Sequence, residues 1–154
     1  TVFAARYRDK IANDANFVPQ NVSRLKNGGL EIAARQQLGL WALAGEATLQ
    51  NMVDADTEAR QLRRPRQQLA WRAYRDAGAF GAGVALRHVG ARPDFGGVAL
   101  PSHTLVDLSA RWRFAAWTWS AVLDNLFDRA YQPTAGFNGK PRSLFVSLAW
   151  QAQP

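Results

Sequence analysis

The stretch that decides the fold is VDLSARWRF-AA-WTWSAVLD, residues 106–124. On both sides of the Ala115-Ala116 pair, every second residue is apolar, and most of the residues between them are polar. Only an extended strand puts every second side chain on one face. The stretch therefore predicts two antiparallel strands joined by a very short turn.

The same period of two extends outward in both directions and predicts an all-β chain. The Ala-rich segments 30–49 and 69–86 have helical propensity, but the glycines inside them argue against helices. We expect eight strands, at about residues 2–12, 22–36, 40–53, 66–75, 79–91, 103–114, 117–127 and 142–150.

The connections between these strands alternate in length. The long ones are 13–21, 54–65, 92–102 and 128–141, and the short ones are 37–39, 76–78 and 115–116. Short turns at one end and long loops at the other are typical of outer-membrane barrels. We therefore predict an antiparallel up-and-down transmembrane β-barrel segment of about eight strands; that it is part of a larger barrel is implied by the family resemblance described below.

Two sets of side chains support this interpretation. Aromatic residues next to the short turns predict a girdle at the bilayer interface: Trp41, Tyr74, Phe80, Phe114, Trp117 and Trp150. Residues of the polar parity are expected to line a wet lumen: Asp107, Ser109, Arg111, Thr118, Ser120 and Asp124. The apolar parity would then face lipid.

Composition excludes several other classes of protein. The 154 residues carry a net charge of +7 and contain no cysteine, so disulfide scaffolds, zinc–thiolate sites and cysteine nucleophiles are excluded. The two histidines show no catalytic or metal-ligand spacing, so we expect no enzyme activity, no cofactor and no metal. The longest stretches without Asp, Glu, Lys or Arg are 12 residues, too short for a membrane helix.

Two clusters of charged residues are expected to lie in solvated regions of the surface. The basic run Arg60, Arg63, Arg64 and Arg66 lacks interleaved aromatic residues, so we do not expect nucleic-acid binding. On an extracellular rim these arginines could meet lipopolysaccharide phosphates, or be simply solvated. The acidic residues Asp54, Asp56 and Glu58 predict a solvated loop.

A longer motif adds a family resemblance. Val122-Leu-Asp-Asn-Leu-Phe-Asp128-Arg-Ala-Tyr131, followed by Gly139-Lys-Pro-Arg142 and the last strand, resembles the penultimate-strand signature of TonB-dependent outer-membrane receptors. Residues 62–68 and 85–92 also resemble this family, and they are most similar to its cobalamin-receptor branch.

The resemblance implies a role for the chain. Barrels of this family have roughly 22 strands around a plug, and this chain would be the last eight strands, residues 1–154, without the plug. It implies uptake of a large scarce nutrient, cobalamin or a siderophore, in the bacterial outer membrane. The implied partners are outer-membrane lipid and lipopolysaccharide, the missing barrel strands and plug, and the energy-coupling protein TonB.

The resemblance also assigns a barrel-assembly signal to the last strand. The residues of that signal would be Leu144, Val146, Leu148 and Trp150. Barrels of this family usually end on the aromatic residue, whereas here the tail Gln151–Pro154 follows Trp150.

Ligand contacts are expected in two long loops. Tyr131, Phe137 and Asn138 lie in loop 128–141, and Asp94 and Phe95 lie in loop 92–102. Aromatic and amide groups on one rim suit a large amphipathic ligand. Two other interpretations stay open on the residues alone: a complete small eight-stranded barrel that binds or anchors, and, more weakly, an enzyme on a β-scaffold.

Overall fold

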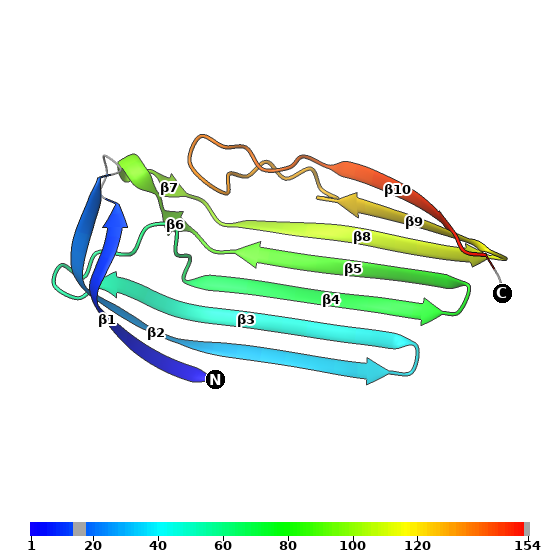
Figure 1. Ribbon diagram of the computed structural model, residues 1–154, viewed down its shortest axis with the longest axis horizontal. Helices are drawn as coiled ribbons and strands as arrows, with labels where there is room; N and C mark the ends of the chain where they lie inside the picture. Colours follow the sequence, from blue (N-terminus) through cyan, green and yellow to red (C-terminus); the bar gives the residue numbers. More distant parts are fainter. Residues whose placement is uncertain (14–17, 153–154) are drawn as a thin grey trace.

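The computed structural model describes residues 1–13 and 18–152, and nearly all of its regular structure is β-strand (Figure 1). Eight long strands carry the fold: β1 (Val2–Asn13), β2 (Pro19–Leu38), β3 (Trp41–Asp54), β4 (Gln67–Ala77), β5 (Phe80–Val89), β8 (His103–Phe114), β9 (Trp117–Asp124) and β10 (Ser143–Trp150). Two short strands, β6 (Arg92–Pro93) and β7 (Ala99–Leu100), flank a 3₁₀ turn, η1 (Phe95–Gly97), inside one long loop.

The eight long strands form a single sheet in the order β1-β2-β3-β4-β5-β8-β9-β10, and every neighbouring pair is antiparallel. This confirms the predicted up-and-down arrangement. β1 and β10 lie at opposite edges of the sheet, so the described chain does not close into a small barrel of its own. Each of these two edges exposes backbone groups that a further strand of a larger barrel could pair with.

The strand ends differ from the predicted ones by three residues in two places and by at most two residues elsewhere. β2 begins at Pro19 and runs to Leu38, so it is longer at both ends than the predicted 22–36. β9 ends at Asp124 instead of residue 127, because Asn125 adopts a left-handed conformation with φ of 51° and takes the chain out of the strand. The predicted alternation of short turns and long loops is confirmed for the connections that follow β2 (Figure 1). Of the predicted loop 13–21, residues 14–17 lie outside the described residues, and residues 13 and 19–21 belong to β1 and β2.

The register of the sheet gathers the apolar side chains on one face, which we call the apolar face. Trp112 pairs with both Phe80 and Trp119, and Trp119 pairs with Leu148. Large side chains on this face are exposed, for example Val146 at 61% and Leu148 at 46%. A broad apolar surface of this kind is expected where lipid is the solvent.

Tyr74 does not belong to the predicted girdle. It pairs with Ala42 and Gly83, so it lies on the opposite, polar face of the sheet. The Arg111 guanidinium lies 5.9 Å from the centre of its ring. The prediction was wrong because it considered the level of the ring along the strand and not its parity.

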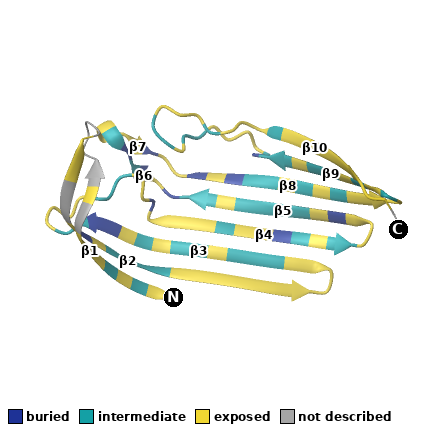
Figure 2. Ribbon diagram, in the orientation of Figure 1, coloured by how far each residue is buried: buried dark blue, intermediate teal, exposed yellow. Residues whose placement is uncertain are grey.

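Most of the buried apolar side chains lie at the end of the sheet that carries the long loops (Figure 2). They are Leu25, Met52, Val53, Leu100 and Leu105. Four buried polar residues accompany them: Arg92, Asp94, His103 and Asn125. We call this region, with segments 55–66, 90–102 and 125–142, the long-loop end, and the opposite end, with turns 39–40, 78–79 and 115–116, the short-turn end. No helix among the described residues is long and apolar enough to cross a membrane.

Candidate functional site

Asp94 joins the three long loops at one point. Its side chain is fully buried, and its Oδ1 accepts hydrogen bonds from Arg63 Nε at 2.7 Å and from the Phe95 amide at 2.8 Å. Its Oδ2 accepts from the Ala135 amide at 2.7 Å. Because Arg63 and Ala135 come from the two other long loops, a single carboxylate holds all three together. Asp94 was predicted as a ligand contact, and the structure places it beneath the rim instead of on it.

The charge state of Asp94 follows from these contacts. Burial alone would raise the pKa of its carboxyl, but the hydrogen bonds from Ala135, Arg63 and Phe95 outweigh burial and lower the pKa below its ordinary value. The carboxylate therefore stays ionised at neutral pH. Phe95 is half-buried and lies under the Arg63 guanidinium, 4.8 Å from its ring centre, as a second part of this junction.

The Asn125-Leu-Phe-Asp128 motif has a structural role that the sequence did not show. Asn125 is 3% exposed, and its side-chain amide donates to the carbonyl oxygens of Arg129 at 3.0 Å and Lys140 at 3.1 Å. Its Oδ1 accepts from the Arg129 amide at 2.9 Å, and its own amide donates to Asp107 Oδ1 at 2.8 Å. The motif therefore closes the base of loop 125–142 and ties it to β8.

Tyr131 is part of the same support. Its ring stacks on buried His103 with the centroids 4.6 Å apart. On another side it lies so close to Gly139 that a Cβ there would collide with the ring. Arg92, which is also buried, donates from Nη2 to the carbonyl oxygens of Gln132 at 3.1 Å and Pro133 at 2.7 Å. Tyr131 is thus half-buried within the loop.

Phe137 and Asn138 lie on the surface of this supported loop. Phe137 is 68% exposed, and a short antiparallel bridge with Thr134 holds its backbone. The Asn138 side chain is exposed, and its Oδ1 accepts only a long hydrogen bond, 3.4 Å, from Gln132 Nε2. Of the five predicted ligand residues, these two combine exposure with free recognition chemistry, and the structure brings them together at the rim.

The charged clusters of the rim are mostly engaged within the protein. Arg63 binds Asp94, Arg60 donates to the Ala91 carbonyl at 3.2 Å, and Arg66 donates to Asn51 Oδ1 at 3.1 Å. The acidic loop pairs with β2 in the same way, Asp56 with Arg24 and Glu58 with Lys26. Of the basic run, only Arg63 forms an ion pair among the described residues, so the charges of Arg60, Arg64 and Arg66 stay available for phosphate groups. Among the described residues there is no group of three or more His, Cys, Asp or Glu side chains placed to hold a metal ion.

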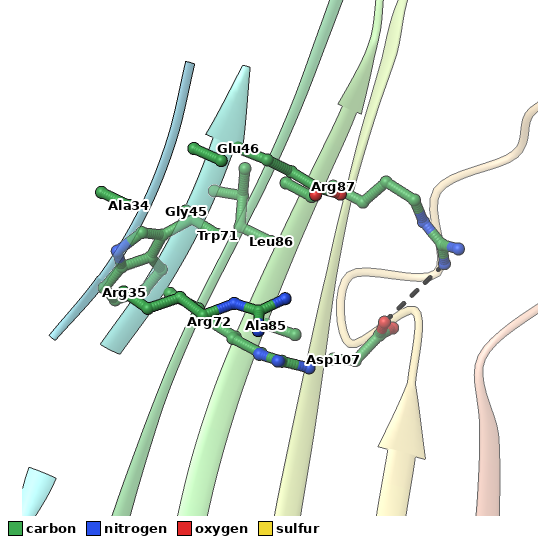
Figure 3. A pocket seen from close by; sticks show the side chains of 13 residues that line it. Ala34, Arg35, Gly45, Glu46, Trp71, Arg72, Ala85, Leu86, Arg87 and Asp107 are labelled. Atoms are coloured by element: carbon green, nitrogen blue, oxygen red, sulfur yellow. Dashed lines mark ion pairs between the residues drawn. The ribbon is translucent and has the colours of Figure 1, made fainter. Parts of the chain in front are cut away.

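The polar face contains a hollow of about 390 Å³ in the middle of the sheet (Figure 3). Arg35 and Arg72 line it on either side of Ala44, which pairs with both. Arg87 points towards Asp107 on the same face, with Nη2 and Oδ2 3.8 Å apart. Neither Arg35 nor Arg72 has an ion-pair partner in the part of the chain that the structure describes. This face also carries the predicted lumenal residues.

Known proteins with this sequence pattern and fold are outer-membrane receptors. Residues 1–126 match the family described as TonB dependent receptor-like, beta-barrel. The vitamin B12 transporter BtuB of Vibrio vulnificus (strain YJ016) is 30% identical over 125 residues, which are 80% of this chain and 20% of that protein.

Solved structures agree in fold. The pyoverdine outer membrane receptor FpvA from Pseudomonas aeruginosa PAO1 superposes with a TM-score of 0.82 at 20% identity, covering 98% of this chain and 26% of that one. The copper transporter OprC gives a TM-score of 0.76 at 18% identity, covering 94% of this chain and 27% of that one. The chain thus spans about a fifth to a quarter of the proteins that it matches. From its motif, its open antiparallel sheet and these matches, the chain belongs to the TonB-dependent receptor β-barrel family of the bacterial outer membrane.

Proposed function

We propose that the full-length protein is a TonB-dependent transporter of cobalamin. The observation that carries this proposal is the 30% identity to a vitamin B12 transporter over four-fifths of the chain. This segment supplies part of the barrel wall and the three long loops of the rim. The remaining barrel strands, the plug and the contact with TonB would come from other parts of the protein.

Within this segment, loop 125–142 is the ligand contact. Phe137 offers a flat apolar ring and Asn138 offers both donors and an acceptor, which suits a ligand with apolar and amide surfaces. Asp94, Phe95 and Tyr131 act one layer below, because their contacts hold the loop in place. A rim that is ordered before binding loses less conformational entropy when the ligand arrives.

The polar face would form the wall of the lumen. Arg35 and Arg72 are exposed and have no ion-pair partner among the described residues. They would meet the plug or the passing ligand, since both face away from lipid; Arg72 lies at the middle of β4 and Arg35 lies three residues before the end of β2. This assignment is consistent with a passive role for the segment: it binds, orients and encloses, and the coupled movement belongs to the plug and TonB.

The test is equilibrium binding of cyanocobalamin to outer membranes that contain the full-length receptor. Burial of one aromatic ring against a ligand is worth on the order of 1.5–3 kcal/mol, so Phe137→Ala/Asn138→Ala should weaken binding at least tenfold. Phe127→Ala is the matched control, because Phe127 is 72% exposed in the same segment and is not part of the proposed contact. Barrel abundance is measured in parallel for all variants.

Different outcomes would contradict the assignment of the loop and the assignment of the ligand. Unchanged affinity of the double variant at normal abundance would contradict the loop assignment. If the unmutated receptor binds a ferric siderophore and no cobalamin, the ligand assignment is wrong and the siderophore alternative takes its place.

A further inference from the structure

The apolar face contains a hollow of about 370 Å³ near the short-turn end. Its floor consists of Ala82 of β5, Ala110 of β8 and Ala121 of β9, which pair with one another across the sheet. Larger side chains on both sides of this row stand higher, so the row forms a trough across the strands. The trough opens towards the surface that we assign to lipid.

An aromatic wall borders the trough on the side of the short turns. Phe80 stacks on Trp112 with the ring centres 6.0 Å apart and the planes 12° apart, and Trp112 pairs with Trp119. Trp rings collect at the level of lipid headgroups, because they combine an apolar body with a polar N–H. The wall therefore marks the membrane interface on the short-turn side, which is periplasmic in outer-membrane barrels.

Arg75 stands at one end of the trough. It pairs with Ala82, so its side chain is on the apolar face, and it is exposed. It has no ion-pair partner among the residues that the structure describes, whereas its neighbour Asp76 is on the polar face and binds Arg111 at 2.8 Å. The described residues that line the hollow include no acidic side chain.

The two ends of the trough lie at different distances from the short turns. Arg75 lies two residues before the end of β4 at Ala77, whereas Ala110 lies four residues before the end of β8 at Phe114. Because barrel strands are tilted by about 35–45°, a row that crosses them descends from the interface towards the hydrocarbon. A charge at the shallow end and apolar side chains at the deep end match the two ends of a lipid.

We propose that this trough is a binding site for an inner-leaflet phospholipid with a net negative headgroup. Its phosphate binds the Arg75 guanidinium, which can donate two parallel hydrogen bonds to phosphate oxygens. One acyl chain lies over the three alanines. A zwitterionic headgroup is disfavoured, because no acidic side chain lines the site to receive its ammonium group.

The test uses the full-length receptor, purified with an equimolar mixture of phosphatidylglycerol and phosphatidylethanolamine that have identical acyl chains. Native mass spectrometry counts the lipids that remain bound. We expect phosphatidylglycerol to be retained roughly fivefold over phosphatidylethanolamine, the effect of one Arg beside an anionic lipid. Arg75→Gln should lower this ratio to about one, and Arg75→Lys should keep most of it.

Two further variants make the result specific. Arg72→Gln is the matched control: Arg72 is on the same strand, three residues away, but on the polar face, so the ratio should not change. Ala110→Phe fills the trough with an apolar side chain that lipid tolerates, so the barrel should assemble and retained phosphatidylglycerol should fall. Equal effects of Arg75→Gln and Arg72→Gln would overturn the site. Receptor dimers that disappear in Ala110→Phe, without any lipid preference, would assign the trough to a second copy instead.

Discussion

The two ends of the same sheet are stabilised in opposite ways. At the long-loop end, buried polar side chains hold the loops: Asp94 accepts hydrogen bonds from two other loops, and Asn125 closes the base of its own loop. At the short-turn end, Phe80, Phe114 and Trp150 are more than 60% exposed. The difference shows that each end is adapted to its own solvent, water at the rim and lipid around the wall.

The two ends of the sheet should also respond to different kinds of substitution. A buried polar group that loses its partner costs about 1–3 kcal/mol, so the long-loop end is sensitive to changes in hydrogen bonding. The wall is sensitive to charge instead, because a cation on the lipid face cannot find water near the midplane. Loss of a side-chain amide should therefore destabilise the long-loop end most, and introduction of a charge should destabilise the lipid-facing wall most.

The largest effect is expected at Asn125. Asn125→Ala removes three side-chain hydrogen bonds and puts Ala at a φ of 51°, so we expect a loss of about 4 kcal/mol of unfolding free energy. Asn125→Gly removes the same bonds without the backbone strain and should cost about 1 kcal/mol less. Urea unfolding of the full-length receptor in vesicles measures both, and Asn138→Ala, an exposed amide in the same loop, is the control. Equal stability of Asn125→Ala and Asn138→Ala would contradict the role of the motif.

The next effect distinguishes the two faces of β10. Leu148 is on the apolar face and Ser147 on the polar face, so Leu148→Arg should be worse than Ser147→Arg. An arginine on the lipid face costs roughly 2–4 kcal/mol near the midplane and less towards the interfaces. Leu148 lies near one end of β10, so we expect about 2 kcal/mol. The yield of heat-modifiable folded barrel in the full-length receptor measures the difference, and equal yields would show that the assignment of faces is wrong.

The third prediction concerns pH and is restricted to the long-loop end. The lowered pKa of Asp94 means that the folded loops favour its ionised form, so the stability that it contributes is present above its ordinary pKa of about 3.9 and is lost as the pH falls through the lowered value. The amides of Ala135 and Gly136 should therefore stay protected at pH 5 and lose protection only as the pH falls below the ordinary pKa of the carboxyl.

Hydrogen exchange, corrected for its intrinsic pH dependence, measures this protection. Asp94→Asn keeps the shape of the side chain but removes the charge that Arg63 binds, so we expect a loss of about 1–2 kcal/mol of loop stability at neutral pH. The acid step should also disappear in this variant. An acid step that persists in Asp94→Asn would assign the titration to another group.

The last strand offers a smaller test of a sequence prediction. The outward residues Leu144, Val146, Leu148 and Trp150 are exposed on the apolar face, as an assembly signal would require. Ending the full-length receptor directly after Trp150 should leave assembly equal or faster, because the family pattern ends at the aromatic residue. Pulse-chase measurement of folded barrel gives the rate, and slower assembly would mean that the tail contributes to the signal.

Much of the site could not be predicted from the sequence, for identifiable reasons. Asp94 was expected as a ligand contact because it lies in a long loop of the rim, and nothing local shows that Arg63 and Ala135, 31 and 41 residues away, converge on it. Tyr131 is a second case, since Tyr131 lies in a loop and its stacking partner His103 lies at the start of β8. The exposure of Phe137 and Asn138 was predictable, because an exposed loop residue needs no distant partner. Their contact with a ligand stays a prediction.

The sequence by itself determined the period of each strand, the alternation of short turns and long loops, and the family. These properties depend on neighbours one or two residues apart, or on local motifs, so they can be read along the chain. Only the tertiary structure decided which residues of the long loops are buried and hold the loops together, and which are exposed on their surface. It also decided that Tyr74 faces the polar side, and that three alanines from three strands line up beside Arg75. These are consequences of register, and register is set by pairing between segments that the chain brings together only on folding.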